Sequence, residues 1–330
     1  MKIAVFSTKS YDEIYLEKYK TETKHTLSYF ETALNSDTTN LTIGYEGVCV
    51  FVNDKIDKKT VESLAKNGVK LIALRCAGFN NIDLKAAQEN NIKIVRVPAY
   101  SPEAVAEHAV AMILTLNRKT HKVYNRVRES NFSLENLTGF NLFGKTVGVI
   151  GTGQIGTAFC KIMIGFGCKV VAYDVKKSKE LEKKGVDYQT LDEVLKHSDI
   201  ISLHCPLTKE THHLFDTSAF SKMKDGVMFI NTSRGALIKT QDTIEALKKG
   251  KIGYLGIDVY EQEENLFFKD LSESIIQDDL IQRLISFPNV LITPHQGFFT
   301  EEALTQIAIT TMKNISDFEE GNELMNEVKS

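Results

Sequence analysis

The stretch Thr146-Val-Gly-Val-Ile150, followed directly by Gly151-Thr-Gly-Gln-Ile-Gly156, decides the fold of this chain. The first part is an apolar run of strand length, and the second places three glycines at the spacing of a turn that binds a dinucleotide. Gly151 permits a tight turn from strand to helix, and Gly153 leaves room for the backbone to approach a pyrophosphate. Gly156 allows the following helix to pack closely on the strand.

The residues after this turn support the same interpretation. A helix from Ile155 to about Phe166 would direct its N-terminal N–H groups at the phosphates. The next apolar run ends in Asp174, roughly 20 residues beyond the first glycine, where a carboxylate binds the adenosine ribose. Asp174 would repel a 2′-phosphate, which favours NAD over NADP, although Lys176 and Lys177 could soften this preference. A structural turn in another α/β protein is the alternative, because glycine-rich turns are common.

Composition and charge limit the classes of protein to which the chain can belong. Its 330 residues are enough for about two domains, and its net charge of -3 argues against nucleic acid or a membrane surface as partner. Five cysteines without metal-ligand spacing predict core residues in a reducing cytoplasm, and we expect no metal site. No apolar segment has the length of a signal peptide or of a membrane span.

Short apolar runs alternate with helix-forming stretches along the whole chain, which predicts parallel sheets built from βαβ units. In the first hundred residues the runs are Ile3–Ser7, Gly47–Val52, Val69–Leu74 and Ile92–Val97. We therefore expect a doubly wound domain before residue 101. The alternation resumes at the glycine turn and continues to about Thr293.

Two helices define the expected domain limits. Ser101-Pro-Glu starts a helix that should run to about Val127 and cross between domains, and its apolar stripe suits a dimer interface. A last helix is expected from Glu301 to about Glu319. Because a single helix follows the last strand, we infer that this segment folds back on the first domain. The predicted domains are residues 1–100 with 298–330, and residues 101–297.

Ligands of open α/β sheets bind beyond the carboxyl ends of the strands, and three residues near such ends suit the binding and reduction of a keto acid. Arg234 could bind a carboxylate through two hydrogen bonds, although a helix-capping or interdomain arginine is the alternative. His295 could exchange a proton with a carbonyl or an alcohol, with Glu263 as the carboxylate that orients it. A histidine fixed to the backbone is the alternative for His295. Glu261 and Glu264 compete for the partner role, and we expect both to be exposed.

Four other histidines are weaker candidates. His204, at the end of a strand, would contribute near the cofactor, and His108 lies on the long helix. For His212 and His213 the sequence indicates no partner.

Six segments, the glycine turn among them, carry a family resemblance, and they occur in this order along the chain: Leu74-Arg-Cys-Ala-Gly-Phe-Asn-Asn-Ile-Asp83, Val97-Pro-Ala-Tyr-Ser-Pro-Glu-Ala-Val-Ala-Glu-His108, the glycine turn, His204-Cys-Pro-Leu-Thr208, Asn231-Thr-Ser-Arg-Gly-Ala236 and Asp258-Val-Tyr-Glu-Gln-Glu263. With them the chain resembles the NAD-dependent D-2-hydroxyacid dehydrogenases over essentially its whole length, and their lactate-forming branch most closely. Cys76–Phe79 replaces the aliphatic stretch of many relatives, and this matches the lactate-forming branch.

The resemblance implies an α/β fold of two doubly wound parallel-sheet domains, a flavodoxin-like substrate domain and a Rossmann NAD-binding domain. It also implies that Arg234, Glu263 and His295 are the catalytic residues. The substrate-binding residues that it implies are Ala77, Gly78, Tyr100 and Phe298. The implied cofactor-binding residues are Gly151, Gly153, Gln154, Ile155, Gly156, Asp174, Cys205, Pro206, Thr232 and Asp258, with Asp258 at the carboxamide.

The activity implied is the reversible, NADH-dependent reduction of pyruvate to D-lactate by a cytoplasmic homodimer or higher oligomer. Two alternatives stay open. The substrate could be a bulkier 2-keto acid, hydroxypyruvate or glyoxylate, or the chain could be an NAD-sensing protein that acts like a corepressor.

Overall fold

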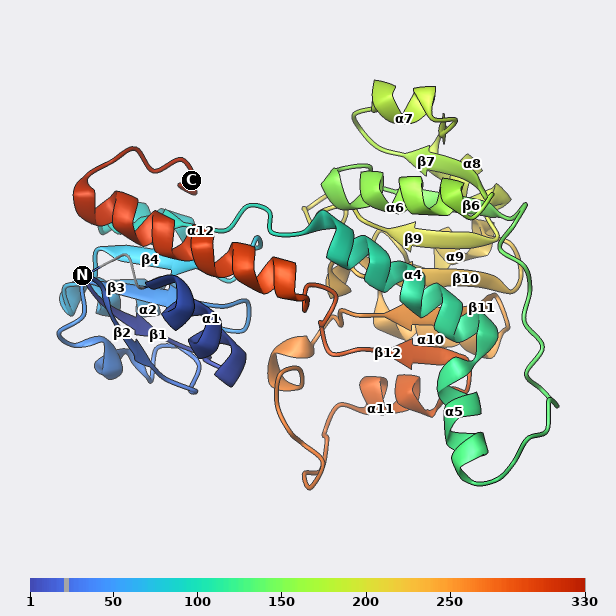
Figure 1. Ribbon diagram of the computed structural model, residues 1–330, viewed down its shortest axis with the longest axis horizontal. Coiled ribbons are helices and arrows are strands. Elements are labelled where there is room, and N and C mark those ends of the chain that lie inside the picture. Colours follow the sequence, from blue (N-terminus) through green and yellow to red (C-terminus); the bar gives the residue numbers. More distant parts are fainter. Residues whose placement is uncertain (21–23, 330) are drawn as a thin grey trace. The chain divides into compact units, whose positions relative to one another are not determined.

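The computed structural model describes residues 1–20 and 24–329. The chain forms two compact units, the first made of Met1–Ser101 and Phe299–Ser330 and the second of Pro102–Phe298. Each unit is a parallel β-sheet with helices packed on it (Figure 1). The predicted fold class, α/β with two doubly wound parallel sheets, is confirmed.

The sheet of the first unit has the strand order β2-β1-β3-β4-β5, which is the flavodoxin-like order. Its strands are β1 (Lys2–Val5), β2 (Thr26–Tyr29), β3 (Gly47–Val50), β4 (Leu71–Leu74) and β5 (Lys93–Val95). The sequence analysis did not predict β2, because Thr-Leu-Ser-Tyr is not an apolar run. This strand lies at the edge of the sheet and none of its residues is fully buried, so its polar residues are tolerated there.

The helices of the first unit are α1 (Ser10–Lys20), α2 (Lys58–Lys66), α3 (Leu84–Glu89) and α12 (Glu301–Glu320), with a short 3₁₀ turn, η1 (Thr39–Thr42). From the C-terminal segment, α12 packs against α1 and β4 and contributes Ala308, Met312 and Ile315 to the core of this unit (Figure 1). It ends at Gly321, whose left-handed φ of 72° suits a residue without a side chain.

The sheet of the second unit has the order β12-β11-β10-β9-β6-β7-β8, in which β6, the strand before the glycine turn, lies between β9 and β7. If β6 is counted as strand 1, the order reads 3-2-1-4-5-6-7 from β8 to β12, which is the Rossmann order 3-2-1-4-5-6 with one additional strand. The strands are β6 (Thr146–Ile150), β7 (Lys169–Tyr173), β8 (Asp187–Tyr188), β9 (Ile200–Leu203), β10 (Val227–Asn231), β11 (Ile252–Ile257) and β12 (Val290–Ile292).

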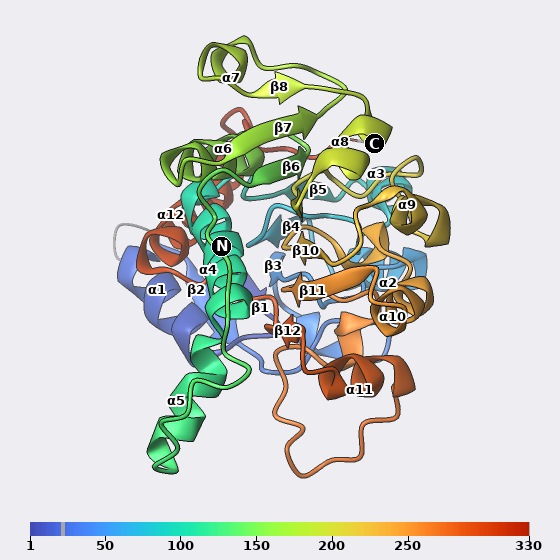
Figure 2. The ribbon, with the colours of Figure 1, turned by 90° about the vertical axis from the view of Figure 1, so that its right-hand side faces the viewer.

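Helices cover both faces of this sheet, as Figure 2 shows. They are α4 (Pro102–Arg118), α5 (Thr120–Arg128), α6 (Gln154–Gly165), α7 (Lys179–Lys183), α8 (Leu191–His197), α9 (Thr217–Lys222), α10 (Thr240–Lys248) and α11 (Asp279–Ser286), with the 3₁₀ turns η2 (Gly235–Leu237) and η3 (Glu263–Asn265). One hydrophobic core lies under α4 and α6, and a second lies under α8, α9 and α10. Strands buried on both sides explain why their sequences are apolar runs and do not alternate.

The expected single helix from Ser101 to about Val127 is wrong. It is interrupted at Lys119, which has a left-handed φ of 52° between α4 and α5. The returning chain accounts for the break: buried Asn117 exchanges two hydrogen bonds with the backbone of Phe140, and Lys119 Nζ donates to the carbonyl of Asn136 at 2.8 Å. These contacts are tertiary, so helical periodicity could not reveal them.

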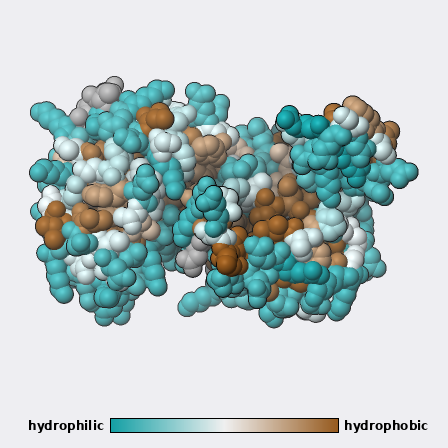
Figure 3. Space-filling model, turned by 90° about the horizontal axis from the view of Figure 1, so that it is seen from below, coloured by the Kyte–Doolittle hydropathy of each residue, from teal (hydrophilic) through white to brown (hydrophobic). Residues whose placement is uncertain are grey.

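On the face drawn in Figure 3, hydrophobic residues form patches within a mainly hydrophilic surface. Within residues 1–20 and 24–329, no helix combines the length and the apolar character needed to cross a membrane.

Candidate active site

The candidate residues of the second unit follow the carboxyl ends of its strands. Because all the strands are parallel, these ends share one edge of the sheet. The direction of winding reverses between β9 and β6, the place where open α/β sheets bind ligands. There the two loops touch: a Cβ atom on Gly151 would lie 2.5 Å from the amide nitrogen of Cys205. In sheet order the sites are His295 after β12, Asp258 after β11, Thr232 and Arg234 after β10, Cys205 and Pro206 after β9, Gly151 to Gly156 after β6, and Asp174 after β7.

The three glycines of the turn have different surroundings. Gly151 has a left-handed φ of 91°, and a Cβ atom on Gly156 would lie 2.0 Å from the carbonyl oxygen of Gly151. By contrast, no atom lies within 4 Å of a Cβ built on Gly153, which is the N-cap of α6. The N-terminus of α6 therefore faces space that a phosphate group can enter, as NAD binding requires.

Two further polar groups also suit the cofactor. Asp174 accepts hydrogen bonds from Thr152 N at 2.6 Å and from Lys176 N at 2.8 Å, so the turn itself orients this carboxylate. Tyr188 donates to the Thr152 hydroxyl and extends the network. The hydroxyl of Thr232 is buried and has no hydrogen-bond partner among the described residues. A bound polar group would satisfy it.

His295 and Glu263 form the pair that the sequence analysis predicts. The imidazole Nδ1 lies 2.8 Å from Glu263 Oε1, and each side chain is about one-fifth exposed, 18% and 22% respectively. Glu263 Oε2 accepts a hydrogen bond from Tyr260 N at 2.9 Å, which fixes the carboxylate. One face of the imidazole lies near the ring of Phe268, with the ring centroids 6.0 Å apart. With Nδ1 engaged, Nε2 is the ring nitrogen for proton transfer.

Asp258 holds the loop that carries His295. Its carboxylate is 2% exposed and accepts hydrogen bonds from the amides of Gln296 at 2.9 Å and Gly297 at 2.8 Å, and from the Thr293 hydroxyl. His108 of α4 joins this cluster, with Nε2 3.0 Å from the Thr293 hydroxyl. The sequence analysis gave His108 no role and assigned Asp258 to the cofactor; in the structure the loop itself uses much of the hydrogen-bonding capacity of Asp258.

Arg234 follows β10 and pairs with no carboxylate in the described part of the chain. Its Nη1 donates to the carbonyl of Ser233 at 2.7 Å, while its own carbonyl accepts from Asn231 Nδ2 at 2.8 Å. The side chain is half-buried. A substrate carboxylate could therefore bind this guanidinium without breaking an ion pair.

The candidate residues of the first unit follow β4. Ala77 and Gly78 are half-buried, and their amide N–H groups have no acceptor within the described ranges. Two arginines fix this loop. Arg96 Nη1 donates to the Ala77 carbonyl at 2.7 Å, and Arg75, which begins the loop, pairs with Asp12 at 3.1 Å. Of the other two candidates, Tyr100 is half-buried and Phe298, the last residue of the second unit, is 6% exposed.

Two sequence-based expectations, for Glu261 and for His213, are wrong. Glu261, expected to be exposed, is half-buried and bonded to His213, which was expected to have no partner. His204 is held by Ser202 at 2.9 Å, and burial lowers its pKa to about 3, so it is neutral at physiological pH. The His213–Glu261 contact had no signal in the sequence, because it depends on how two distant loops meet, whereas Ser202 and His204 are only two residues apart.

Residues 110–297 match the family described as "D-isomer specific 2-hydroxyacid dehydrogenase, NAD binding domain". The chain is 54% identical to the D-lactate dehydrogenase of Escherichia coli K12, over 99% of this chain and 100% of that protein. Its structure is similar to the apo-structure of D-lactate dehydrogenase from Escherichia coli, with a TM-score of 0.91, 52% identity and coverage of 99% and 100%. It is also similar to a structure titled as the pyruvate reductase of Chlamydomonas reinhardtii, with a TM-score of 0.93, 46% identity and coverage of 99% and 98%.

Proposed function

Because the chain belongs to the NAD-dependent D-isomer-specific 2-hydroxyacid dehydrogenases, we propose that it catalyses the reversible reduction of pyruvate to D-lactate. The observation that carries the proposal is the His295–Glu263 pair at 2.8 Å, on the same sheet edge as Arg234, which has no ion-pair partner among the described residues. Relatives named D-lactate dehydrogenase and pyruvate reductase support pyruvate as the substrate.

In this proposal His295 is the general acid. Glu263 engages Nδ1 and orients the ring, so Nε2 is the nitrogen that donates a proton to the keto oxygen as it becomes an alkoxide. In the direction of lactate oxidation the neutral imidazole takes the hydroxyl proton back. The carboxylate of Glu263 keeps the ring oriented in both directions.

Arg234 binds the carboxylate of the substrate and polarises the keto oxygen. The amides of Ala77 and Gly78, which have no acceptor among the described residues, are further groups that we assign to substrate binding. We assign Tyr100 to the neighbourhood of the substrate carboxylate, and Phe298 to the contact with the small side chain of the substrate. Together these groups orient C2 for reduction, and orientation supplies a large part of the rate enhancement.

NADH, when bound, supplies the hydride that C2 accepts. The amides of Gln154 and Ile155 at the start of α6 would hold the pyrophosphate. The turn formed by Gly151, Gly153 and Gly156 leaves room for it beside these amides. Asp174 binds the adenosine ribose. Residues beside the nicotinamide are Cys205, Pro206 and Thr232, with Asp258 at the carboxamide.

The decisive experiment is a panel of 2-keto acids assayed with NADH, followed by chiral analysis of the product. Pyruvate should give the highest kcat/KM and D-lactate as the product. A higher value for hydroxypyruvate, glyoxylate or a bulkier keto acid would contradict the substrate assignment. A chain that binds NADH and reduces none of them would support the NAD-sensing alternative.

For the assembly, we propose a homodimer or higher homo-oligomer. Beyond α5 the chain continues as an extended segment, residues 129–145, which exposes Phe132 at 74%, Leu134 at 82% and Phe143 at 79% (Figure 1). Three large apolar side chains on one segment suit burial against a second copy of the chain. A cytoplasmic location is part of the same proposal, since all five cysteines are free.

A further inference from the structure

We propose that His213 and Glu261 are a positioning pair that joins the segment carrying Arg234 to the segment carrying Glu263. This second histidine–glutamate pair lies outside the set of residues that handle the substrate. The inference rests on the proposed function, in which Arg234 binds the carboxylate and Glu263 orients the proton donor.

The side chains of the pair are tightly connected. His213 Nε2 lies 2.6 Å from Glu261 Oε1, and the side chains are 29% and 23% exposed. The other oxygen, Glu261 Oε2, accepts from the Thr240 hydroxyl at 2.8 Å and from Thr240 N at 3.2 Å. Burial by itself raises the pKa of Glu261, but the hydrogen bonds from Thr240 and His213 lower it overall. An ionised carboxylate thus binds two separate segments.

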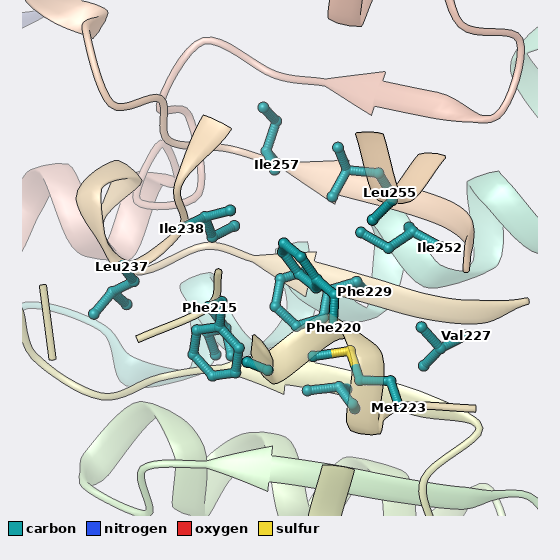
Figure 4. Close-up of a cluster of buried hydrophobic side chains, with 14 of the residues drawn as sticks. Phe215, Phe220, Met223, Val227, Phe229, Leu237, Ile238, Ile252, Leu255 and Ile257 are labelled. Carbon is teal, nitrogen blue, oxygen red and sulfur yellow. The ribbon is translucent and has the colours of Figure 1, made fainter. Parts of the chain in front are cut away.

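The backbone of His213 binds a third segment, the turn that follows Arg234. Its N–H donates to the carbonyl of Ala236 at 2.8 Å, and two residues later Phe215 N donates to Leu237 at 3.0 Å. His213 has a left-handed φ of 52°, which directs its backbone and its imidazole to different neighbours. Leu237 and Phe215 belong to one apolar cluster, as Figure 4 shows. The turn after Arg234 is therefore fixed to the loop after β9.

The two functional segments also touch directly. A Cβ atom on Gly235 would lie 2.1 Å from the carbonyl carbon of Tyr260, so there is no room for a side chain between them. Tyr260 N donates to Glu263, as described above. Arg234 is the residue before this contact, and Glu263 lies two residues after Glu261. A shift at the His213–Glu261 bond would displace both functional groups together.

A pair of substitutions at His213 tests the role of the bond. In His213→Leu the donor to Glu261 is lost, and kcat/KM for the keto acid should fall about tenfold, with a raised KM for the keto acid. In His213→Gln the side-chain amide can still donate, so most of the loss should be recovered. His197→Leu is the matched control: it removes an exposed His–Glu ion pair on α8 and should leave both parameters unchanged.

Hydrogen–deuterium exchange provides a readout that does not depend on the substrate. Peptides covering residues 231–240 and 259–266 should exchange faster in His213→Leu than in wild type, and should regain protection in His213→Gln. Wild-type kinetics in His213→Leu, or equal defects in the Leu and Gln variants, would overturn the proposal. A lower Tm with unchanged kinetics would also overturn the proposal. That result would mean that the pair stabilises the fold and does not position Arg234 and Glu263. If the wild-type chain reduces no keto acid, the proposed function fails, and the exchange of the two peptides still tests the coupling.

Discussion

At the scale of single residues, the candidates chosen from the sequence agree best with the contacts in the structure where the residue directly follows the end of a strand. His295, Glu263 and Arg234 were selected because of their residue types and their positions in loops. The structure brings His295 and Glu263 together, and it shows Arg234 without an ion-pair partner among the described residues. The His213–Glu261 bond was not foreseen, because its partners are 48 residues apart and no periodic pattern links them.

Substitution of His295 and of Arg234 should separate proton transfer from carboxylate binding. We expect His295→Gln to lower kcat by about 10²–10⁴ and to leave the KM for pyruvate nearly unchanged, since only the general acid is lost. Arg234→Gln should also raise that KM, by roughly 10–100-fold, because a charge-assisted contact is removed. Steady-state kinetics measure both effects, with the exposed Arg283→Gln as control. Wild-type rates in both variants would remove the assignment.

His204 should make the protein less stable in mild acid. Its pKa in the folded state, about 3, lies below the unfolded value of about 6.5. Between these pH values the unfolded chain therefore binds more protons than the folded chain. The contribution of neutral His204 to the free energy of unfolding is fully present above about pH 6.5 and is lost as the pH falls toward 3. The decline is at most about 1.4 kcal/mol per pH unit.

Urea unfolding of wild type and of His204→Gln at pH 7 and pH 5 measures this effect. The variant should lose less free energy of unfolding between the two pH values, because glutamine does not titrate. His197→Gln, on the exposed side of α8, serves as control. Equal losses in wild type and in His204→Gln would show that His204 does not cause the dependence.

At the scale of elements, helices with a capping residue and a glycine stop were the most predictable. The end of α12 at Gly321 is an example, since the glycine supplies the left-handed conformation that the helix end requires. The break at Lys119 and the edge strand β2 were missed. Contacts from the returning chain produce the first, and a partly exposed position in the sheet permits the second.

The glycine turn allows folding and cofactor binding to be separated. In Gly156→Ala the new methyl group would meet the carbonyl oxygen of Gly151, so we expect a loss of roughly 1–3 kcal/mol of stability. In Gly153→Ala the methyl group has open space in the protein, so Tm should be retained while NADH binds more weakly. Thermal melts and NADH fluorescence titrations compare the two variants. Unchanged NADH affinity in Gly153→Ala would contradict the pyrophosphate position.

At the scale of the whole molecule, the chain leaves the first unit at Ser101 and returns to it at Phe299. The return depends on α12, whose apolar side chains complete the core beside α1 and β4. In the second unit, parallel strands place all the loops that follow them at one edge. Residues more than 100 positions apart in the sequence, such as Asp174 and His295, thereby become parts of one sheet edge.

Assembly is testable through the extended segment after α5. Phe132→Asp combined with Leu134→Asp should shift an oligomer toward monomers, because charged residues oppose burial of that surface. Mass photometry measures the change, and Ile275→Asp, in a different exposed loop, is the control. A wild-type chain that is monomeric at micromolar concentration would refute the proposed assembly.

The sequence by itself determined the two parallel sheets, the glycine turn with its acidic partner Asp174, and the residue types that we propose for the reacting set. These features depend on local pattern: apolar runs, glycine spacing and chemistry at strand ends. Only the tertiary structure decided which side chains meet, as in the bonds of His213 to Glu261, His108 to Thr293 and the loop amides to Asp258. The physical reason is the separation of these residues along the sequence. A hydrogen bond between distant loops forms only after the sheet has placed both loops at the same edge.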